Sequence, residues 1–107
     1  PINFNIKNSR FTAFDVRQAS YWAVLSGSLG ITYGNNNIWQ MYDKGREGIV
    51  WARTPWHIAL HHPGAQQMGY LRWLFESRAF LLLTPDQSCV KDHKGAPTDL
   101  IRAARAS

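Results

Sequence analysis

The stretch GITYGNNNIWQMY, residues 30–42, places aromatic rings beside short amide side chains. Four of its residues are suited to binding a sugar: Tyr33, Asn35, Asn36 and Trp39. A ring can stack on the face of a sugar, and amides bond its hydroxyl groups without charge. An ordinary turn needs one Asn or Gly for its backbone and gains nothing from two large rings. The pattern predicts a carbohydrate-binding loop, although core aromatics and a loop-stabilising asparagine cluster fit the same letters.

The acidic side chains give no recognisable catalytic pair. Hydrolysis of a glycosidic bond needs two carboxyl groups that face each other across that bond. Asp43 and Glu47 share a long loop, but the letters DKGRE indicate a solvated corner. We therefore name no catalytic residue in this chain. The other acids are expected in a helix cap, a surface ion pair, a turn and a linker: Asp15, Glu76, Asp86, Asp92 and Asp99.

Three histidines have a spacing that can hold a metal ion. His57 and His61 are four residues apart, and His62 follows directly. A metal-binding helix of the H-E-x-x-H type also carries a glutamate, which is missing here, and no other ligand cluster is evident. We expect packing or hydrogen-bonding roles for these histidines, and neither a metal nor a cofactor.

Composition limits the class of protein. With 107 residues, the chain is long enough for about one small domain. A hydrophobic fraction of 45% argues against a disordered chain, and no apolar run approaches the roughly 20 residues of a membrane span. The net charge of +5 is spread along the chain, whereas nucleic-acid binding usually shows a concentrated basic stripe. We expect neither a nucleic-acid nor a membrane partner.

A helix followed by a strand is predicted before the amide-rich loop. Thr12 and Asp15 form a capping-box pattern, and Gly27 ends the helix. This helix is apolar around much of its girth, so we expect it to pack on more than one side. The segment GITYG, residues 30–34, is predicted as a buried strand. A helix, a short connection and a strand make half of an αβ unit.

Two further helices are predicted after the loop. In the first, Thr54 is the expected N-cap and Pro55 the first helical residue; Pro63 ends it and opens the second. Arg72 and Glu76 are expected as an exposed pair. The expected buried face of the second helix comprises Met68, Leu71, Leu74 and Phe75, extended by Tyr70 and Trp73.

A change of composition near Thr84 and Pro85 marks the expected domain boundary. Beyond it, SCV leans towards strand and DLIRAARA is a second strand candidate, joined by a polar linker over residues 91–98. The chain opens on Pro1 and closes on TDLIRAARAS, so we expect it to be a piece of a longer protein.

The motifs F-D-V-R-x-A-x-Y-W, T-Y-G, W-Q-M-Y, P-G-A-x-Q-M and P-D-Q-S occur in this order over nearly all of the chain. In this order they resemble the apiosidase-like glycoside hydrolases. The resemblance implies a (β/α)8 TIM-barrel catalytic domain followed by a small β-sandwich named for collagen binding. The fold class is then α/β: residues 1–84 are a C-terminal fragment of the barrel, and residues 85–107 are the first strands of the sandwich.

The family resemblance also implies the activity. Members are expected to be retaining enzymes that hydrolyse O-glycosyl bonds of polysaccharides, with an acid/base carboxylate after the fourth strand and a nucleophilic Glu after the seventh. Both positions lie outside this chain, so the chain alone is expected to be inactive and to need the rest of the barrel for folding. Tyr33, Asn35, Asn36 and Trp39 carry over as substrate-site residues of the eighth-strand loop. The resemblance favours a secreted or periplasmic location.

Two weaker candidates and one alternative remain. Asn3 and Asn5 are expected at the rim of the same site. The alternative function is a non-catalytic, basic, aromatic-rich module that binds carbohydrate or nucleic acid. Independent folding of the chain as a monomer favours the module, and a need for further barrel strands favours the fragment.

Overall fold

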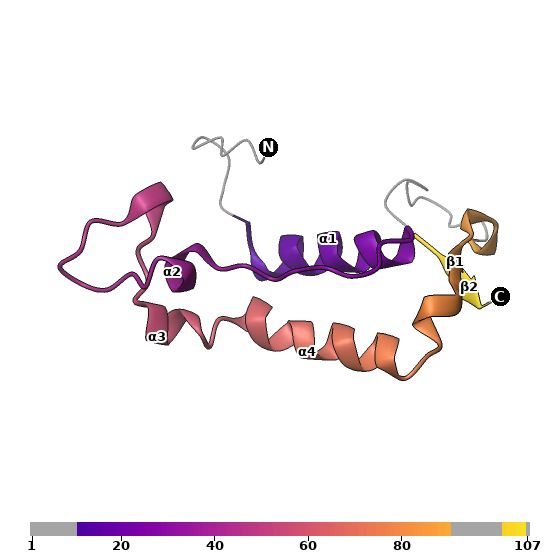
Figure 1. The fold of residues 1–107 in the computed structure, drawn as a ribbon. Helices are drawn as coiled ribbons and strands as arrows, with labels where there is room; N and C mark the ends of the chain where they lie inside the picture. The colour runs from indigo at the N-terminus through magenta and orange to yellow at the C-terminus, as the bar shows by residue number, and fades with distance from the viewer. Residues whose placement is uncertain (1–10, 91–101, 107) are drawn as a thin grey trace.

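A computed structural model describes residues 11–90 and 102–106. Helices form the body, and two short strands lie at one end (Figure 1). The fold therefore mixes helix and strand in an elongated molecule of 52 × 31 × 23 Å. In chain order the elements are α1 (Ala13–Leu25), α2 (Asn36–Trp39), the 3-10 helix η1 (Ile49–Trp51), α3 (Trp56–Ala59), α4 (Pro63–Glu76), η2 (Phe80–Leu82), β1 (Leu83–Pro85), η3 (Gln87–Cys89) and β2 (Ala104–Ala106).

Helix α1 begins with the predicted capping box. The Thr12 hydroxyl accepts a hydrogen bond from the Asp15 backbone N–H, and the Asp15 carboxylate accepts one from the Thr12 N–H at 2.7 Å. The Thr12 hydroxyl also donates to this carboxylate. These bonds lower the pKa of Asp15, the hydroxyl most and the backbone N–H next. At the other end, Gly27 takes a left-handed φ of 100°, which confirms the predicted stop.

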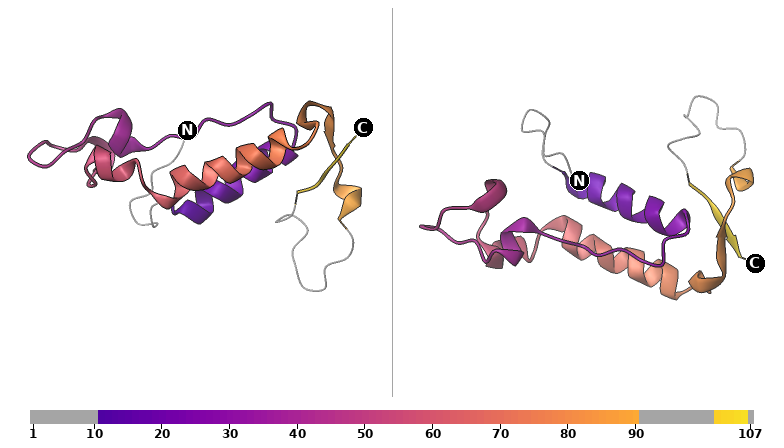
Figure 2. Two further views of the ribbon diagram at one scale, coloured as in Figure 1. Left: turned by 90° about the horizontal axis from the view of Figure 1, so that it is seen from below. Right: turned by 45° about the horizontal axis from the view of Figure 1, so that its top comes forward.

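Helices α1 and α4 pack side by side and form the centre of the molecule (Figure 2). Leu71 and Phe75 of α4 are buried, and the Tyr21 ring of α1 lies 6.3 Å from the Phe75 ring between centroids. Arg17 donates to the Gln67 side-chain oxygen at 2.6 Å, which ties the helices together at their edge. Among the described residues, no helix has the length and apolar content needed to cross a membrane.

The outer face of α4 differs in part from the prediction. Arg72 and Glu76 form the expected exposed ion pair, at 2.7 Å. Tyr70 and Trp73 are each 71% exposed, so they do not extend the buried stripe as predicted. No described segment crosses this face. An aromatic residue at a helical spacing is buried only where a neighbouring element covers it.

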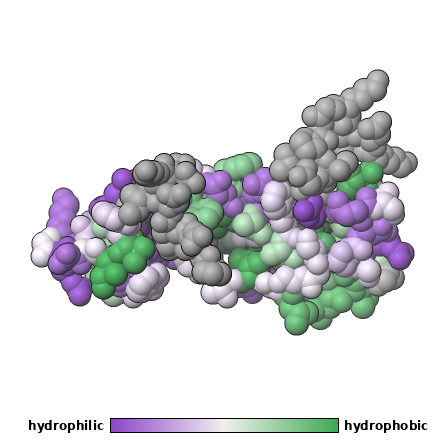
Figure 3. Space-filling model, turned by 90° about the horizontal axis from the view of Figure 1, so that it is seen from above, coloured by the Kyte–Doolittle hydropathy of each residue, from purple (hydrophilic) through white to green (hydrophobic). Residues whose placement is uncertain are grey.

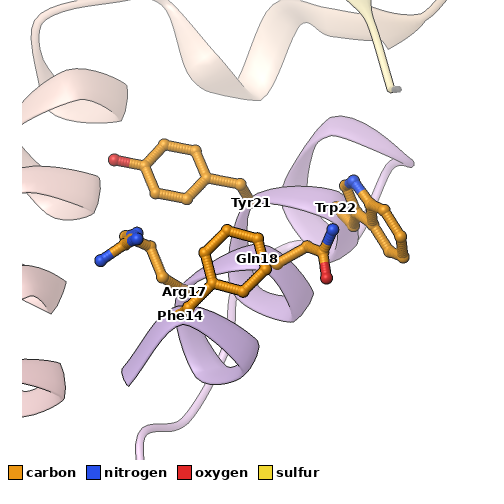
Figure 4. Close-up of a pocket in the computed structure, with 5 residues that line it drawn as sticks. All are labelled: Phe14, Arg17, Gln18, Tyr21 and Trp22. Atoms are coloured by element: carbon orange, nitrogen blue, oxygen red, sulfur yellow. The ribbon is translucent and has the colours of Figure 1, made fainter. Parts of the chain in front are cut away.

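One face of α1 is open, although packing on more than one side is predicted. Phe14, Arg17, Gln18, Tyr21 and Trp22 line a shallow hollow of about 380 Å³ on this face (Figure 4). Phe14 is 56% exposed, and Ser20 is the one buried residue of α1. Helix α4 reaches the edge of this face at Arg17 and Tyr21, and the Arg102 guanidinium lies 5.3 Å from the centre of the Trp22 ring. The hollow is therefore only partly covered by the described part of the chain.

The segment from Gly30 to Gly34 does not form the predicted buried strand. It runs along the helix pair towards α2 without a hydrogen-bonded neighbouring strand among the described residues (Figure 1). Leu29, directly before it, is 87% exposed, and Ile31 is also exposed. A strand needs a partner for its backbone N–H and C=O groups, and the described part of the chain supplies none.

The C-terminal strands form a small antiparallel sheet. Leu83 of β1 pairs with Ala106 of β2, which confirms a strand within DLIRAARA. The letters SCV belong instead to η3 and the residue after it, because Asp86 caps this short helix by accepting from the Ser88 N–H at 3.0 Å. Thr84 and Pro85 lie within β1, so the domain boundary expected there stays a prediction.

The capping box makes the stability of α1 depend on the Thr12 hydroxyl group. Replacing Thr12 with Ala (Thr12→Ala) should lower the free energy of unfolding by about 1 kcal/mol, because the Asp15 N–H then loses its acceptor. Urea denaturation of the whole protein that contains this chain measures the loss. Thr12→Ser keeps the hydroxyl and should stay within about 0.5 kcal/mol of the wild type. Equal losses in both variants would contradict the capping role.

The loss of stability in Thr12→Ala should depend on pH. The pKa of Asp15 is lower in the folded than in the unfolded protein, so the capping contribution is present above the unfolded-state pKa. It is lost as the pH falls through the folded-state pKa. The stability difference between the wild type and Thr12→Ala should therefore narrow on acidification.

Candidate functional site

The three asparagines form the start of α2. Asn35 is its N-cap, and the Asn35 Oδ1 accepts from the Asn37 backbone N–H at 3.1 Å. The same oxygen accepts from the Asn37 side-chain nitrogen at 2.9 Å. Asn and Asp at an N-cap supply the acceptor that the first free N–H groups of a helix need. The amide cluster therefore starts a single helical turn directly after the Gly30–Gly34 segment.

Asn37 is the buried member of the cluster. Its Oδ1 accepts from the backbone N–H groups of Arg53 and Thr54 at 3.1 and 3.2 Å. The beginning and the end of the long loop are thus joined through one side chain. Sequence reasoning did not single out Asn37. The three letters NNN are alike, and only the helical turn of α2 decides which of them points inward.

Thr54 is therefore not the N-cap of the next helix, as predicted. Its N–H is bonded to Asn37, and α3 begins after Pro55 with no side-chain cap. The N–H of Trp56 donates instead to the Tyr42 carbonyl oxygen, at 2.8 Å. Pro63 occupies the first turn of α4, which confirms that part of the prediction.

Asn36 and Gln40 hold the tip of the loop. The Asn36 side-chain nitrogen donates to the carbonyl oxygens of Ile49 and Val50, at 3.1 and 2.9 Å. Gln40 donates to the Ile49 carbonyl oxygen and accepts from the Ile49 N–H, both at 2.9 Å. Gln40 also donates to the Asn36 Oδ1, at 2.6 Å. We call these bonds the loop clamp.

The loop clamp holds a strained backbone. Met41, Val50 and Trp51 have φ values of 50°, 52° and 62°, in the left-handed region that residues with a side chain rarely adopt. Each such residue costs on the order of 1–3 kcal/mol and persists only where surrounding contacts hold it. Gly48 is needed nearby, because a Cβ there would collide with the Ala52 carbonyl oxygen. Strain held by side-chain bonds is typical of functional loops.

The structure places the four predicted sugar-site residues in two groups. Asn35, Asn36 and Trp39 lie within α2 and its cap, and Trp39 is 65% exposed. Tyr33 is half-buried and packs on Gly64, where an added Cβ would lie 3.5 Å from the Tyr33 hydroxyl oxygen. The amides of Asn35 and Asn36 are bonded within the protein. Of the two aromatic rings in this set, that of Trp39 is therefore the more exposed.

His62 connects α2 to α4. The Asn35 side-chain nitrogen lies 3.1 Å from the His62 Nδ1, and His62 directly precedes Pro63 at the start of α4. Within residues 11–90 and 102–106, no three His, Cys, Asp or Glu side chains gather closely enough to hold a metal ion. Asn3 and Asn5 lie outside the described residues.

Three acids of the described segments have the structural roles predicted for them. Asp15 caps α1, Glu76 pairs with Arg72, and Asp86 occupies a turn where its carboxylate lies 3.0 Å from Arg105. Bonds from the Ser88 hydroxyl and N–H, with a smaller effect of Arg105, lower the pKa of Asp86. These carboxylates are therefore accounted for without a catalytic role.

Comparisons with known proteins agree with the motifs. The model of the apiosidase-like catalytic domain matches residues 1–82. A solved structure described as a glycoside hydrolase superposes with a TM-score of 0.84 at 37% identity. Another, a glycoside hydrolase family 5 protein from Bacteroides vulgatus ATCC 8482, gives a TM-score of 0.84 at 34% identity. Each comparison covers 96% of this chain but 23% of the solved chain, so this chain spans under a quarter of those structures. No curated protein matches it.

Removal of the Asn37 amide tests its role in closing the loop. In Asn37→Ala, the N–H groups of Arg53 and Thr54 lose their acceptor, and the free energy of unfolding should fall by about 2 kcal/mol. Amide hydrogen exchange at these two residues should also accelerate. Gln66→Ala removes an exposed amide of α4 and should change neither quantity. Unchanged exchange at Arg53 and Thr54 would contradict the role of Asn37.

Proposed function

Because the chain belongs to the apiosidase-like family of catalytic domains, we propose that it forms the C-terminal part of a (β/α)8 barrel in a retaining glycoside hydrolase. Residues 1–84 end the barrel, and residues 85–107 begin a β-sandwich. The substrate is an O-glycosidic bond of a plant or microbial polysaccharide. The catalytic carboxylates come from outside this chain, which supplies one wall of the sugar site.

The arrangement of α1, the Gly30–Gly34 segment and α4 supports the barrel. In a (β/α)8 barrel each strand lies inside the outer ring of helices and bonds to strands on both sides. Here the segment between α1 and α4 runs along both helices and has no paired strand among the described residues (Figures 1 and 2). The neighbouring strands are then the missing partners of this segment.

Exposed apolar surface supports the same view. Phe14 at the α1 hollow, together with Leu29 and Ile31, is open to solvent in the described chain. Apolar side chains also gather at the lower right of the surface in Figure 3. Over residues 11–90 and 102–106, the buried apolar side chains are few: Pro55, Ala59, Leu71 and Phe75. The remainder of the barrel is the partner that buries this surface.

The observation that carries the site proposal is an open tryptophan on a clamped helical turn. Trp39 is 65% exposed, and the loop clamp holds the residues on either side of it, Asn36 and Gln40. In a barrel, the segment after a strand faces the ligand. Trp39 stacks on a sugar ring, and Tyr33 forms the adjacent wall. Asn35 and Asn36 position this turn, and Asn35 keeps a second N–H for a sugar hydroxyl.

The proposed reaction is tested on the whole protein that contains this chain. Purified protein is incubated with a panel of plant and microbial polysaccharides, and the release of reducing sugar is measured. The anomeric form of the first product is then followed by proton NMR. Hydrolysis with retained configuration is expected. An inverted product would refute the retaining mechanism, and binding of polysaccharide without hydrolysis would favour a non-catalytic module.

The stacking role of Trp39 has a direct kinetic test. Trp39→Ala should lower kcat/KM by about tenfold, because a loss of stacking worth about 1.4 kcal/mol corresponds to that factor. Trp73→Ala is the matched control: this residue is also an exposed tryptophan, but it lies on α4. It should leave kcat/KM unchanged. Unaltered kinetics in a folded Trp39→Ala protein would eliminate the stacking role.

A further inference from the structure

The direction of the hydrogen bonds in the asparagine cluster is fixed by backbone groups. The N–H groups of Arg53 and Thr54 can only donate, so the atom of Asn37 that they contact must be its oxygen. The nitrogen of the same amide then faces the Asn35 Oδ1. The Asn37 backbone N–H contacts this oxygen too and fixes the Asn35 amide in the same way.

The fixed amides determine the protonation of His62. With its oxygen held by Asn37, Asn35 turns its NH₂ group towards the His62 Nδ1 at 3.1 Å. An NH₂ group can only donate, so Nδ1 must accept and carries no proton. A neutral imidazole has one N–H, which is then on Nε2. An imidazolium would place two donors against each other at this contact.

His62 is a neighbour of two residues of the proposed sugar site. His62 is half-buried, its neighbour through Nδ1 is Asn35, and Tyr33 packs on Gly64 two residues after it. The Nε2 has no hydrogen-bond partner among the described residues. A half-buried N–H group is stabilised by an acceptor. One ring nitrogen of His62 is thus engaged by Asn35, and the other is left for a ligand.

We propose that His62 is a substrate-binding residue whose neutral ring donates the Nε2 hydrogen to a sugar hydroxyl oxygen. This inference rests on the proposed function, since it places the sugar beside α2. A donor fixed by the hydrogen bonds of Asn37 and Asn35 discriminates between sugars, because an analogue without the hydroxyl leaves the N–H unpaired. His62 is then a specificity-determining residue, and the chain of Asn37 and Asn35 sets its tautomer.

The tautomer is tested without any measurement of activity. The whole protein is labelled with ¹⁵N-histidine, and the His62 signals are assigned by their loss in His62→Gln. For the neutral ring, a protonated Nε2 and an unprotonated Nδ1 are expected. Asn35→Asp places a carboxylate opposite Nδ1 and should move the proton to that atom. A proton on Nδ1 in the wild type, or identical spectra in both proteins, overturns the inference.

The contact with sugar is tested by a double comparison. The substrates are the hydrolysed oligosaccharide and its monodeoxy analogues, each lacking one hydroxyl. With the wild type, kcat/KM for one analogue should be at least tenfold lower than for the parent oligosaccharide. With His62→Phe, kcat/KM for that analogue should be nearly equal to kcat/KM for the parent. Equal losses in both proteins overturn the contact even if His62→Phe is correctly folded. If His62→Phe does not fold, the same analogues are compared in His62→Leu, which is smaller and likewise lacks the Nε2 hydrogen.

Failure of the proposed function is distinguishable from failure of this inference. A protein that shows the expected His62 tautomer but hydrolyses no glycoside refutes the proposed function, and the proposed sugar contact with it. A protein that hydrolyses glycosides and depends on Trp39 supports the proposed function. If its preference among deoxy analogues is then unaffected by His62→Phe, only the His62 inference is refuted.

Discussion

The buried amide of Asn37 is the interaction on which the loop depends. Its oxygen accepts from Arg53 and Thr54, and its nitrogen and backbone N–H both donate to Asn35. One side chain therefore joins the start of α2 to the segment before α3 and fixes the orientation of the next amide. A buried amide satisfied on both sides stabilises a single geometry, because any other arrangement leaves polar groups unpaired. The position of Trp39 follows from this geometry.

In the helical body of the molecule, by contrast, the apolar packing is incomplete. Helices α1 and α4 share one packed side, where Leu71 and Phe75 are buried, while the hollow on α1 and the Gly30–Gly34 segment are open. Among the described residues every fully buried polar side-chain atom thus has a partner, whereas much of the apolar surface is open. This chain covers only 23% of each solved relative. That coverage accounts for the contrast, because a segment of a larger fold keeps its local hydrogen bonds and lacks its distant packing partners.

The sequence predicts the features that depend on near neighbours in the chain. The capping box of Thr12 and Asp15, the stop at Gly27 and the start of α4 at Pro63 each involve residues within one turn, and the structure contains all three. The buried strand at Gly30–Gly34 and the burial of Trp73 depend on elements far away in the sequence, and these predictions are wrong for the described chain. Propensity carries no information about such partners.

The candidate site, too, could be predicted only in part from the sequence. Its residues were found from their types, since amides and rings in one short stretch are unusual, and three of the four do lie in one turn with its cap. The inward direction of the amides and the contact with His62 could not be predicted, because the donors come from Arg53, Thr54 and α4. The left-handed residues Val50 and Trp51 have a thermodynamic consequence for any ligand of this loop. Since the clamp restricts their backbone before binding, little further conformational entropy is lost when a ligand arrives, and affinity rises without an added contact.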